Sequence, residues 1–573
     1  MNILGIVAHT LGYGDAGAAL MTGGRVAGVV EEERFSRIRY DDGFPWRSIA
    51  WLLDQGRLEA GDIDEIAIHV DPWRNLPNRL FWLLRHPIDT ALNIGEQLDY
   101  ARRCGDLGRT FASVFNGAMP PIRHYEHHLC HAAAAFYTSQ FERAAYLTLD
   151  GTGEGVTGTI GVVDAAAGPR TLVKSSFPHS LGFVYSAIGD FIGFTPPEGP
   201  GKVMGLAGYG DAARFRGLMR QAVGVRDDRL WVNLDDFLFH RNLATPLSRK
   251  PWVSPAFARK AGFARRSKDQ ELTQIHIDLA AALQERTNEI GVELARRAVE
   301  LTGESNLCIA GGVALNSVMN GKIHDAGVCE ALHIQPAAGD AGNALGAVFL
   351  SSLARGRVPD RFADLPYSGP GFGQDEIESV LRSRGIPFVI SDTVARDAAE
   401  AVSQGKVVGW FQGRMEYGPR ALGCRSILAD PRNPQIRDVI NSKVKHREWF
   451  RPFAPSIAEE ALSRYFGGPT SNPYMLIVAE VREQWRAVFP AVTHVDGSAR
   501  VQSVSASSNA RYHELLRHME TLTGHPIVLN TSFNDREPIV CTPEDAARCF
   551  LGTNIDMLFM GDCVVDKEML DPS

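Results

Sequence analysis

The chain has 573 residues and a formal charge of −8, and it is longer than one hydrophobic core usually supports. We therefore expect at least two globular domains, and the acidic balance argues against a polyanion such as nucleic acid as the main partner. The N-terminus lacks the basic region of a signal peptide, and no apolar run approaches the ~20 residues that span a bilayer, so a cytoplasmic protein with no membrane partner is expected.

The first half of the chain alternates short β-rich runs with glycine turns. Residues 3–7, 18–20 and 26–30 are predicted to form a strand meander, with Thr22-Gly23-Gly24 as a hairpin turn. Further buried strands are predicted at residues 144–150, 157–163 and 307–310, and a helix is expected from about residue 314. Strands that end in glycine turns are typical of actin-like and sugar-kinase-like ATP folds, in which main-chain N–H groups bind phosphates.

The first candidate site is rich in histidine. Residues 124–131 read HYEHHLCH and precede four alanines, so a helix is expected in which His127 and His131 share one face. His124 and His128 have the same spacing, and spacing alone does not choose between the two pairs. The plainer alternative is a polar helix end whose histidines bond to main-chain groups. Asp150 and Asp340 each lie beside a glycine and can complete a site for Fe(II), Mn(II) or Zn(II).

Residues 355–374 are rich in Pro and Gly and show no clear period, which predicts a linker. We place one domain at residues 1–358 and a second at residues 373–573. The second begins with a predicted helix at residues 394–404, and a buried strand at 406–410 follows, with a turn at Gly413.

The second candidate site is cationic. Residues 413–426 read GRMEYGPRALGCRS and carry Arg414, Arg420 and Arg425 between glycines and a proline, and Lys445 and Arg451 follow around an aromatic pair. Arginine binds phosphate through two parallel hydrogen bonds and lysine neutralises it as a point charge, so the pattern indicates a site for a small dianion. Surface ion pairs are the plainer explanation for any single arginine.

Seven motifs carry a family resemblance: EEERFSR, HHLCHAAAAFY, GKVMGLAGYG, AGGVALNSVMNGK, GPRALGCRSIL, KHREWFRPFAPS and LNTSFN. Together they resemble the nodulation/cephamycin/tobramycin family of O-carbamoyltransferases, in the same order from residue 1 to about residue 565. The resemblance implies an α/β protein. Its N-terminal domain would be actin-like (ASKHA, duplicated ribonuclease H-like) and its smaller C-terminal domain YrdC-like.

The resemblance also implies two steps. The C-terminal domain would form carbamoyl adenylate from ATP, with Mg²⁺, and carbamoyl phosphate, and the N-terminal domain would transfer the carbamoyl group to a hydroxyl of a small molecule in antibiotic tailoring. A metal, Fe(II) or another divalent transition metal, would polarise the carbamoyl carbonyl. The implied residues are Arg420, Lys445, Arg451, Arg500 and Ser532 for carbamoyl phosphate; Gly205, Gly208, Gly311, Gly312 and Asn316 for the nucleotide; and His127, His131, Asp150 and Asp340 for the metal.

The chain departs from the family pattern at two places. Relatives often carry a histidine before the aspartate found here as Asp15, and this chain has Gly14, so His9 or Asp15 is the candidate base for the acceptor hydroxyl. Lys445 and Arg451 complete the expected catalytic set. After LNTSFN, the relatives usually have an extra glycine, and no role is assigned to Asp535 or Arg536.

Two other functions compete with transfer to a small molecule. One is a tRNA-modifying enzyme that carbamoylates an amino group, which the absent basic surplus disfavours. The other is a non-enzymatic actin-like ATP-binding scaffold, which has no need of a cationic anion pocket. Residues 212–270 match no motif, and the sequence leaves both the acceptor and a homodimeric state open.

Overall fold

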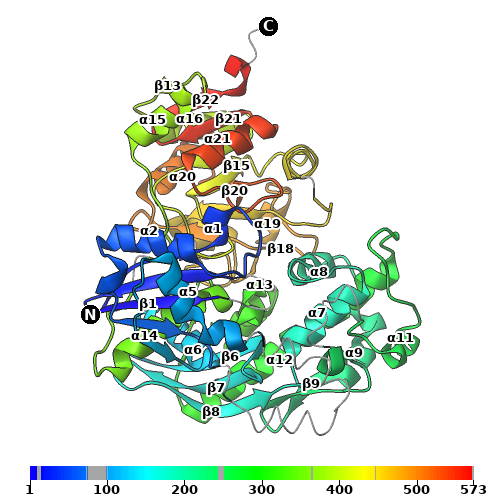
Figure 1. The fold of residues 1–573 in the computed structure, drawn as a ribbon. Helices are drawn as coiled ribbons and strands as arrows, with labels where there is room; N and C mark the ends of the chain where they lie inside the picture. The colour runs from blue at the N-terminus through cyan, green and yellow to red at the C-terminus, as the bar shows by residue number, and fades with distance from the viewer. Residues whose placement is uncertain are drawn as a thin grey trace. The chain divides into compact units, whose positions relative to one another are not determined.

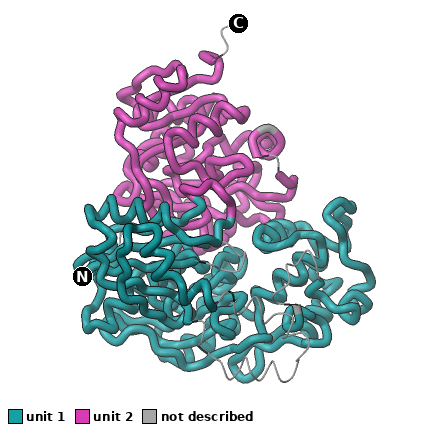
Figure 2. Tube along the Cα trace, viewed as in Figure 1, with its two compact units in different colours: residues 1–33, 40–363 teal, residues 34–39, 364–573 magenta. Residues whose placement is uncertain are grey.

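The structure is a computed structural model that describes residues 1–8, 15–71, 74, 99, 101–242, 251–362, 365–445 and 447–570. The chain forms two compact units (Figure 2). Unit 1 comprises Met1–Glu33 and Tyr40–Ala363, and unit 2 comprises Arg34–Arg39 and Asp364–Ser573. Residues 34–39 therefore group with the C-terminal part of the chain although unit 1 flanks them in sequence. Within the described residues, no helix is both long enough and apolar enough to cross a membrane.

The strands of unit 1 are β1 (Asn2–Val7), β2 (Gly17–Thr22), β3 (Arg25–Glu31), β4 (Glu65–Ile68), β5 (Ile122–His124), β6 (Arg143–Gly153), β7 (Val156–Asp164), β8 (Gly168–Ser176), β9 (Val223–Arg226), β10 (Arg229–Val232), β11 (Asn306–Ala310) and β12 (Ala331–Ile334). Its main helices are α2 (Trp46–Gly56), α5 (Leu107–Val114), α6 (His127–Tyr137), α7 (Leu181–Phe191), α8 (Gly199–Ala207), α9 (Arg216–Ala222), α11 (Pro255–Ala261), α12 (Gln274–Thr302), α13 (Ser317–Asp325) and α14 (Asn343–Ala354).

Unit 1 contains the same sheet topology twice (Figure 1). Among the described residues, one five-stranded sheet has the order β3-β2-β1-β4-β5 and the other β12-β11-β6-β7-β8. In each, the first three strands form an antiparallel meander, and two later strands join the far side of the first strand in parallel. This repetition is what a duplicated ribonuclease H-like architecture requires, so the expected actin-like α/β class is confirmed.

Close helix packing connects the two sheets at the level of α6. Helix α14 packs against both α6 and β1. A Cβ atom at Gly346 of α14 would lie 2.0 Å from the Cys130 carbonyl oxygen, so glycine is required for this approach. The four alanines Ala132–Ala135 are buried on α6, and their small side chains permit contact on all sides of the helix. The strongly apolar environment fixes the start of α6, where the histidines lie.

Unit 2 surrounds one mixed sheet of eight strands among its described residues, in the order β13-β22-β21-β14-β15-β20-β16-β19. These strands are β13 (Val389–Ile390), β14 (Val408–Phe411), β15 (Arg425–Ala429), β16 (Ala454–Ala458), β19 (Gln502–Val504), β20 (Ile527–Ser532), β21 (Met557–Met560) and β22 (Cys563–Asp566), beside a small sheet of β17 (Ala479–Glu480) and β18 (Ser498–Ala499). The principal helices are α15 (Gln374–Ser383), α16 (Val394–Ser403), α17 (Ile436–Ile440), α20 (Ala510–Thr523) and α21 (Pro543–Gly552).

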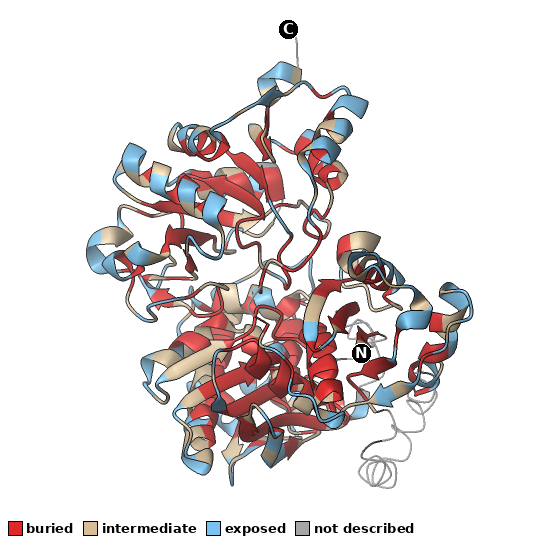
Figure 3. Cartoon of the chain, turned by 90° about the vertical axis from the view of Figure 1, so that its left-hand side faces the viewer, coloured by how far each residue is buried: buried red, intermediate tan, exposed pale blue. Residues whose placement is uncertain are grey.

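Two hydrophobic clusters form the core of unit 2, and Figure 3 shows buried residues concentrated along its strands. One cluster contains the apolar residues of α16 and α20, and the other contains those of α15 and α21. The segment Arg34–Arg39 belongs to this unit through Arg37, which donates 2.7 Å hydrogen bonds to the carbonyls of Ile539 and Pro538 and pairs with Glu537 at 3.0 Å.

Candidate functional site

Four metal-ligating side chains converge in unit 1. His127 and His131 lie one turn apart at the start of α6, Asp150 lies on β6, and Asp340 begins the short helix η4 (Asp340–Gly342). One ligand atom from each lies within 4.8 Å of all the others. The first turn of α6 is fixed by Glu126, whose carboxylate accepts a 2.8 Å hydrogen bond from the Leu129 N–H. The spacing that predicted the pair therefore places both imidazoles toward two carboxylates from distant parts of the chain.

The polar atoms of this cluster are close enough to share one cation. The His127 Nε2 atom lies 3.1 Å from Asp150 Oδ2, and His131 Nε2 lies 3.3 Å from Asp340 Oδ1. The two imidazole Nε2 atoms are 3.0 Å apart. His127 and His131 are at most 3% exposed, and Asp150 is 8% exposed. The arrangement is a compact, largely buried set of two nitrogen and two carboxylate donors.

Neighbouring groups hold these donors in place. A Cβ atom at Gly153 would lie 2.0 Å from His127 Cδ2, so only glycine leaves space for that ring. The Gly312 N–H donates a 3.0 Å hydrogen bond to Asp150 Oδ1, and the amide of Asn343 lies 3.2 Å from His131 Nε2. Contacts of this kind orient ligands and tune their affinity for a metal.

The charged groups of the cluster strongly change one another's pKa values. Burial opposes a charge on His127, but the carboxylates of Asp340 and Asp150 raise its pKa to about 9. Burial likewise opposes ionisation of Asp150, yet hydrogen bonds from His127 and His131 hold its pKa well below the usual range. In the ion-free protein, a proton on His127 thus balances the carboxylates, and a divalent cation bound there would replace it.

The alternative histidine pair has a structural role. His128 is fully buried, and its Nδ1 and Nε2 atoms bond to Thr148 Oγ1 at 2.8 Å and to the Val156 carbonyl at 2.9 Å. His124 Nδ1 lies 2.6 Å from the Val70 carbonyl. Both side chains match the main-chain-bonded explanation, and the structure separates them from the convergent pair His127 and His131.

The donor set fits a divalent transition metal. Two imidazoles with two carboxylates suit Fe(II), Mn(II) and Zn(II), whereas Mg²⁺ and Ca²⁺ prefer all-oxygen sites. Asp340 Oδ1 is buried without a hydrogen-bond partner, although it lies between the two imidazole nitrogens at 3.3 and 3.4 Å. This orphaned oxygen is what a carboxylate ligand presents before a metal binds.

Two further side chains border the cluster. Asp15 is partly buried with a φ of 78°, and its burial and the nearby Asp340 raise its pKa well above the usual range. His69 follows β4 and is 3% exposed, with its ring centroid 5.5 Å from that of His127. Burial and His127 lower the pKa of His69 to about 3. The sequence singled out Asp15 but not His69, and the other expected base, His9, lies outside the described residues together with Gly14.

The predicted nucleotide residues are not all in turns. The turn expected at Gly205–Gly210 is shorter than predicted, because Gly205 lies within α8 and the turn begins at its C-cap, Gly208. Gly311 does adopt a positive φ of 92°, at the end of β11. Gly312 donates to Asp150, as described above, and Asn316 caps α13 and bonds to Gln284 at 3.0 Å. Gly311 and Gly312 therefore lie against Leu149 and Asp150, whereas Asn316 caps α13 and Gly205 and Gly208 lie within and at the end of α8.

A second polar centre lies in unit 2 and is cationic. Arg500 follows β18, and its pKa is lowered well below the usual range by burial and by Arg420, Arg447 and Arg451. The side chain of Lys445 is 5% exposed, and burial together with Arg447 and Arg451 lowers its pKa well below the usual range. Like charges this close to one another are unfavourable without an anion. The structure thus brings together four predicted residues, Arg420, Lys445, Arg451 and Arg500.

Ser532 joins this centre through a direct 3.2 Å hydrogen bond from Lys445 Nζ and through Asn534. Asn534 Oδ1 accepts hydrogen bonds from Lys445 Nζ at 2.5 Å and from Ser532 Oγ at 2.8 Å. Lys445 Nζ also bonds to the main-chain carbonyls of Ser532 and Asn534. Asn534 therefore fixes the position of Lys445 relative to Ser532. Its presence two residues after Ser532 in LNTSFN was the available signal.

Arg447 is another residue that the sequence analysis missed. Burial and Arg451 lower its pKa to about 9, and its Nε donates a 2.7 Å hydrogen bond to Asn441 Oδ1. Its Nη2 atom is buried without a partner. A guanidinium nitrogen in this state beside other cations is suited to an anionic ligand.

Two arginines of the GRMEYGPRALGCRS motif have a structural role instead. Arg425 is fully buried, stacks on Phe411 at 3.7 Å and donates to five main-chain carbonyls, those of Pro370, Gln412, Gly413, Cys424 and Cys541. Arg414 donates to the carbonyls of Ser368 and Gly369. Of the three arginines predicted as an anion-binding set, only Arg420 lies in the cation cluster.

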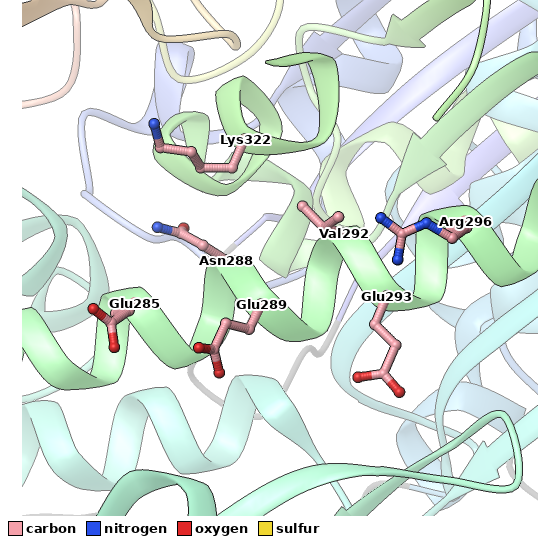
Figure 4. Close-up of a pocket in the computed structure, with 7 residues that line it drawn as sticks. All are labelled: Glu285, Asn288, Glu289, Val292, Glu293, Arg296 and Lys322. Atoms are coloured by element: carbon pink, nitrogen blue, oxygen red, sulfur yellow. The ribbon is translucent and has the colours of Figure 1, made fainter. Parts of the chain in front are cut away.

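A separate groove of about 700 Å³ lies along α12 in unit 1. Figure 4 shows Glu285, Glu289 and Glu293 projecting from α12 on the side away from Lys322 of α13. Glu285 and Glu289 already pair with Arg216 and Arg220 of α9. The groove contains none of the predicted site residues.

Comparisons with known proteins match nearly the whole chain. Residues 93–349 match the family model "Carbamoyltransferase N-terminus", and residues 399–567 match "Carbamoyltransferase C-terminus". The uncharacterized protein sll1178 of Synechocystis sp. is 38% identical over 99% of this chain and 97% of its own length. The nodulation protein NolNO of Sinorhizobium fredii is 38% identical over 97% of this chain and 80% of its own. A solved structure, component A of (R)-2-hydroxyglutaryl-CoA dehydratase from Acidaminococcus fermentans, covers 62% of this chain and 99% of its own at 13% identity, with a TM-score of 0.31.

Proposed function

Because the chain is an enzyme of the carbamoyltransferase family, we propose that it makes carbamoyl adenylate from carbamoyl phosphate and ATP and transfers the carbamoyl group to a hydroxyl of a small-molecule natural product. The observation that carries this proposal is the presence of two separate polar centres, one in each unit. The cation cluster of unit 2 suits phosphate-bearing substrates, and the histidine–aspartate cluster of unit 1 suits a metal. One reaction with two chemically different steps needs both.

The first step belongs to unit 2. Carbamoyl phosphate carries two negative charges, which Arg420, Arg451 and Arg500 would bind while Lys445 neutralises developing charge. Water first hydrolyses carbamoyl phosphate to carbamate and inorganic phosphate. A carbamate oxygen then attacks the α-phosphorus of ATP, and Mg²⁺-bound pyrophosphate leaves. Ser532 donates its hydroxyl proton to Asn534 Oδ1 in the structure and would turn this donor to the same anion when carbamoyl phosphate binds.

The second step belongs to unit 1. His127, His131, Asp150 and Asp340 would hold a divalent metal, Fe(II) in our proposal, which when bound supplies Lewis-acid polarisation of a carbonyl. The acceptor hydroxyl oxygen attacks the carbamoyl carbon, the bond from that carbon to the AMP phosphate oxygen breaks, AMP leaves, and the hydroxyl proton is released. Gly311 and Gly312 are proposed contacts for the adenylate because the Gly312 N–H bonds Asp150, and Asn316 is proposed from its place in the family motif. Asp15 is the proposed base among the described residues.

Transfer within one chain has a chemical rationale. Carbamoyl adenylate is a mixed anhydride that reacts with water, and its formation and use by one chain would limit this loss. A scaffold without catalysis would retain neither a buried cation cluster nor the ligand set, and a tRNA substrate would need a basic surface that a chain of net charge −8 does not predict.

Pyrophosphate release tests the proposal. The purified chain is incubated with ATP, Mg²⁺ and carbamoyl phosphate, and pyrophosphate is measured with and without carbamoyl phosphate. We expect release only with both substrates, its loss in Lys445→Met, and its retention in His127→Ala, because His127 belongs to the second step. No release from the wild type would overturn the proposal. Mass spectrometry of hydroxylated natural products added to the same mixture then identifies the acceptor by a carbamoyl mass gain.

A further inference from the structure

Glu416 is the one carboxylate in the motif GRMEYGPRALGCRS, and it is 3% exposed. Its Oε1 atom accepts hydrogen bonds from the main-chain N–H groups of Leu422, Cys424 and Arg425 at 2.8, 2.7 and 3.0 Å. Three N–H donors stabilise the charge of a carboxylate that has little contact with water. The same bonds fix residues 422–425 relative to Glu416.

The loop before β15 takes its shape from side chains. Residues 417–424 form neither helix nor strand, although most of them are buried. The Gly418 carbonyl accepts a 2.8 Å hydrogen bond from Arg34 Nη2. The Leu422 carbonyl accepts a bond of the same length from Gln502 Nε2. Buried main-chain groups need partners, and because side chains supply them here, these bonds decide the path of the loop.

Arg420 lies in the middle of this loop, two residues after Gly418 and two before Leu422. Its guanidinium is close enough to Arg500 to lower the pKa of that residue. The charge of Arg420 therefore belongs to the cation cluster, and its place there depends on the path of the loop. Glu416 fixes that path from two residues after Arg420 onward.

We propose that Glu416 is a positioning residue, which holds Arg420 in place to bind the phosphate group of carbamoyl phosphate. This inference rests on the proposed function and adds the residue that shapes the anion site. A carboxylate is unsuited to contact with the dianion itself, because like charges repel each other. Glu416 acts instead through the main chain of the loop, to which its Oε1 atom is bonded.

Substitutions at position 416 separate the hydrogen-bond acceptor from the charge. Glu416→Ala removes the acceptor of all three N–H groups. Glu416→Gln keeps an oxygen in the place of Oε1 and puts its NH₂ in the place of Oε2, which has no hydrogen-bond partner in the protein. The glutamine oxygen is a weaker acceptor than a carboxylate but can still hold the loop.

Asp430→Ala is the matched control. Asp430 is also a buried carboxylate, 6% exposed, and it accepts a 2.9 Å hydrogen bond from the Arg432 N–H. It follows the end of β15 opposite to Arg425, so it removes a comparable bond without touching the loop. Both alanine variants should lower the unfolding temperature of unit 2.

Inorganic phosphate is the probe, because carbamoyl phosphate presents the same group and phosphate binding needs no turnover. The dissociation constant of the full chain for phosphate is measured by calorimetry. Glu416→Ala is measured both in the wild-type background and in Arg420→Met. If Glu416 acts through Arg420, the two substitutions cannot have additive effects. A general loosening of unit 2 would weaken binding equally in both backgrounds.

We expect Glu416→Ala to weaken phosphate binding by about tenfold and Arg420→Met by at least as much, the range of a hydrogen bond to a charged group. In Arg420→Met, the further loss from Glu416→Ala should stay below about twofold. Glu416→Gln should bind within about threefold of the wild type, and Asp430→Ala within about twofold. Unchanged binding in Glu416→Ala or in Arg420→Met, or equal losses in the two backgrounds, would overturn the inference.

Pyrophosphate release by the wild type separates failure of the inference from failure of the proposed function. A wild type that binds phosphate but releases no pyrophosphate would refute the proposed first step, and the role of Glu416 in it would fall as well. A wild type that releases pyrophosphate, with Glu416→Ala as active as Asp430→Ala at low carbamoyl phosphate, would refute the inference alone.

Discussion

The Nε2 atoms of His127 and His131 lie 3.0 Å apart across one turn of α6. Two neutral imidazoles cannot hold their lone pairs this close without a proton or a cation between them. The surrounding carboxylates of Asp150 and Asp340 favour positive charge at this point. Proton and metal therefore compete for one place, which makes the pH dependence of this site predictable.

Metal binding should tighten as pH rises. His127 must release its proton to bind, and its pKa is about 9 in the ion-free protein. We expect the apparent affinity for Co(II) or Zn(II) to rise by about tenfold per pH unit from neutral pH toward 9, measured by competition with a chelator. The ion-free protein should change in the opposite sense. Because the folded pKa of His127 lies above its ordinary value of 6.5, its stabilising charge is fully present below pH 6.5 and is lost as pH rises toward 9. An affinity that does not change with pH would contradict this coupling.

Gly153→Ala should empty the metal site. The new Cβ would lie 2.0 Å from His127 Cδ2, so the ring must leave its position. We expect the purified variant to retain less than about a tenth of the wild-type metal, since losing one ligand's orientation lowers affinity 10- to 100-fold. Gly217→Ala is the matched control, because Gly217 lies on α9 with nothing within 4 Å of an added Cβ. Pyrophosphate release should be normal in both, and normal metal content in Gly153→Ala would refute the steric argument.

Arg447→Met should weaken binding of carbamoyl phosphate. Its buried Nη2 atom has no partner in the protein, and a hydrogen bond to a charged group contributes about 1.5–3 kcal/mol. The KM for carbamoyl phosphate should therefore rise at least about tenfold. Inorganic phosphate should inhibit the wild type by competing with carbamoyl phosphate and should inhibit the variant less. An unchanged KM would assign Arg447 to the fold alone, through Asn441 and its stacking on Phe453.

Asn534→Ala should impair pyrophosphate release without affecting the metal. Its Oδ1 atom holds Lys445 Nζ and Ser532 Oγ at 2.5 and 2.8 Å, so both donors lose a common anchor. A misplaced catalytic group costs up to about a hundredfold in rate, and we expect a fall in kcat of at least about tenfold. Metal content, which depends on unit 1, is the internal control. Wild-type kcat in this variant would show that Lys445 needs no support from Asn534.

Arg425→Met should destabilise unit 2. The substitution removes a donor from five carbonyls, of which those of Pro370 and Cys424 keep a main-chain donor, and it removes the stacking on Phe411. A buried acceptor left without a donor costs about 1–3 kcal/mol. We expect a lower unfolding temperature for the transition of unit 2 in calorimetry. Arg414→Met is the comparison, because it removes donors from only the carbonyls of Ser368 and Gly369 and should cost less.

The sequence indicated the metal site better than it indicated the nucleotide site. Four-residue spacing on an expected helix left two equal pairs, and the family resemblance selected His127 and His131. In the structure, Thr148 of β6 and Val156 of β7 occupy the nitrogens of His128. Glycine spacing was less reliable. Gly205 lies inside α8 rather than in a turn, because helix packing around it overrides the low helix propensity of glycine.

Burial explains the residues that the sequence did not reveal. Arg425 and Arg420 have similar neighbours in sequence, yet one is enclosed by main-chain carbonyls and the other lies in the cation cluster. His69 follows an apolar run that predicts only a strand, and its ring comes next to that of His127 only through the fold. The strand meander at residues 3–30 needed no such context, because alternating apolar runs and a glycine hairpin determine it locally.

The grouping of Arg34–Arg39 with unit 2 constrains how the enzyme can be recombined with its relatives. The chain passes between the units three times, after Glu33, after Arg39 and after Ala363. A chimera joined once near residue 363 would combine the Arg37 of one parent with residues 537–545 of another. An exchange of unit 1 between two relatives, made to transfer acceptor specificity, should therefore keep residues 34–39 from the parent that supplies unit 2. These six residues then stay with the C-terminal part that they contact.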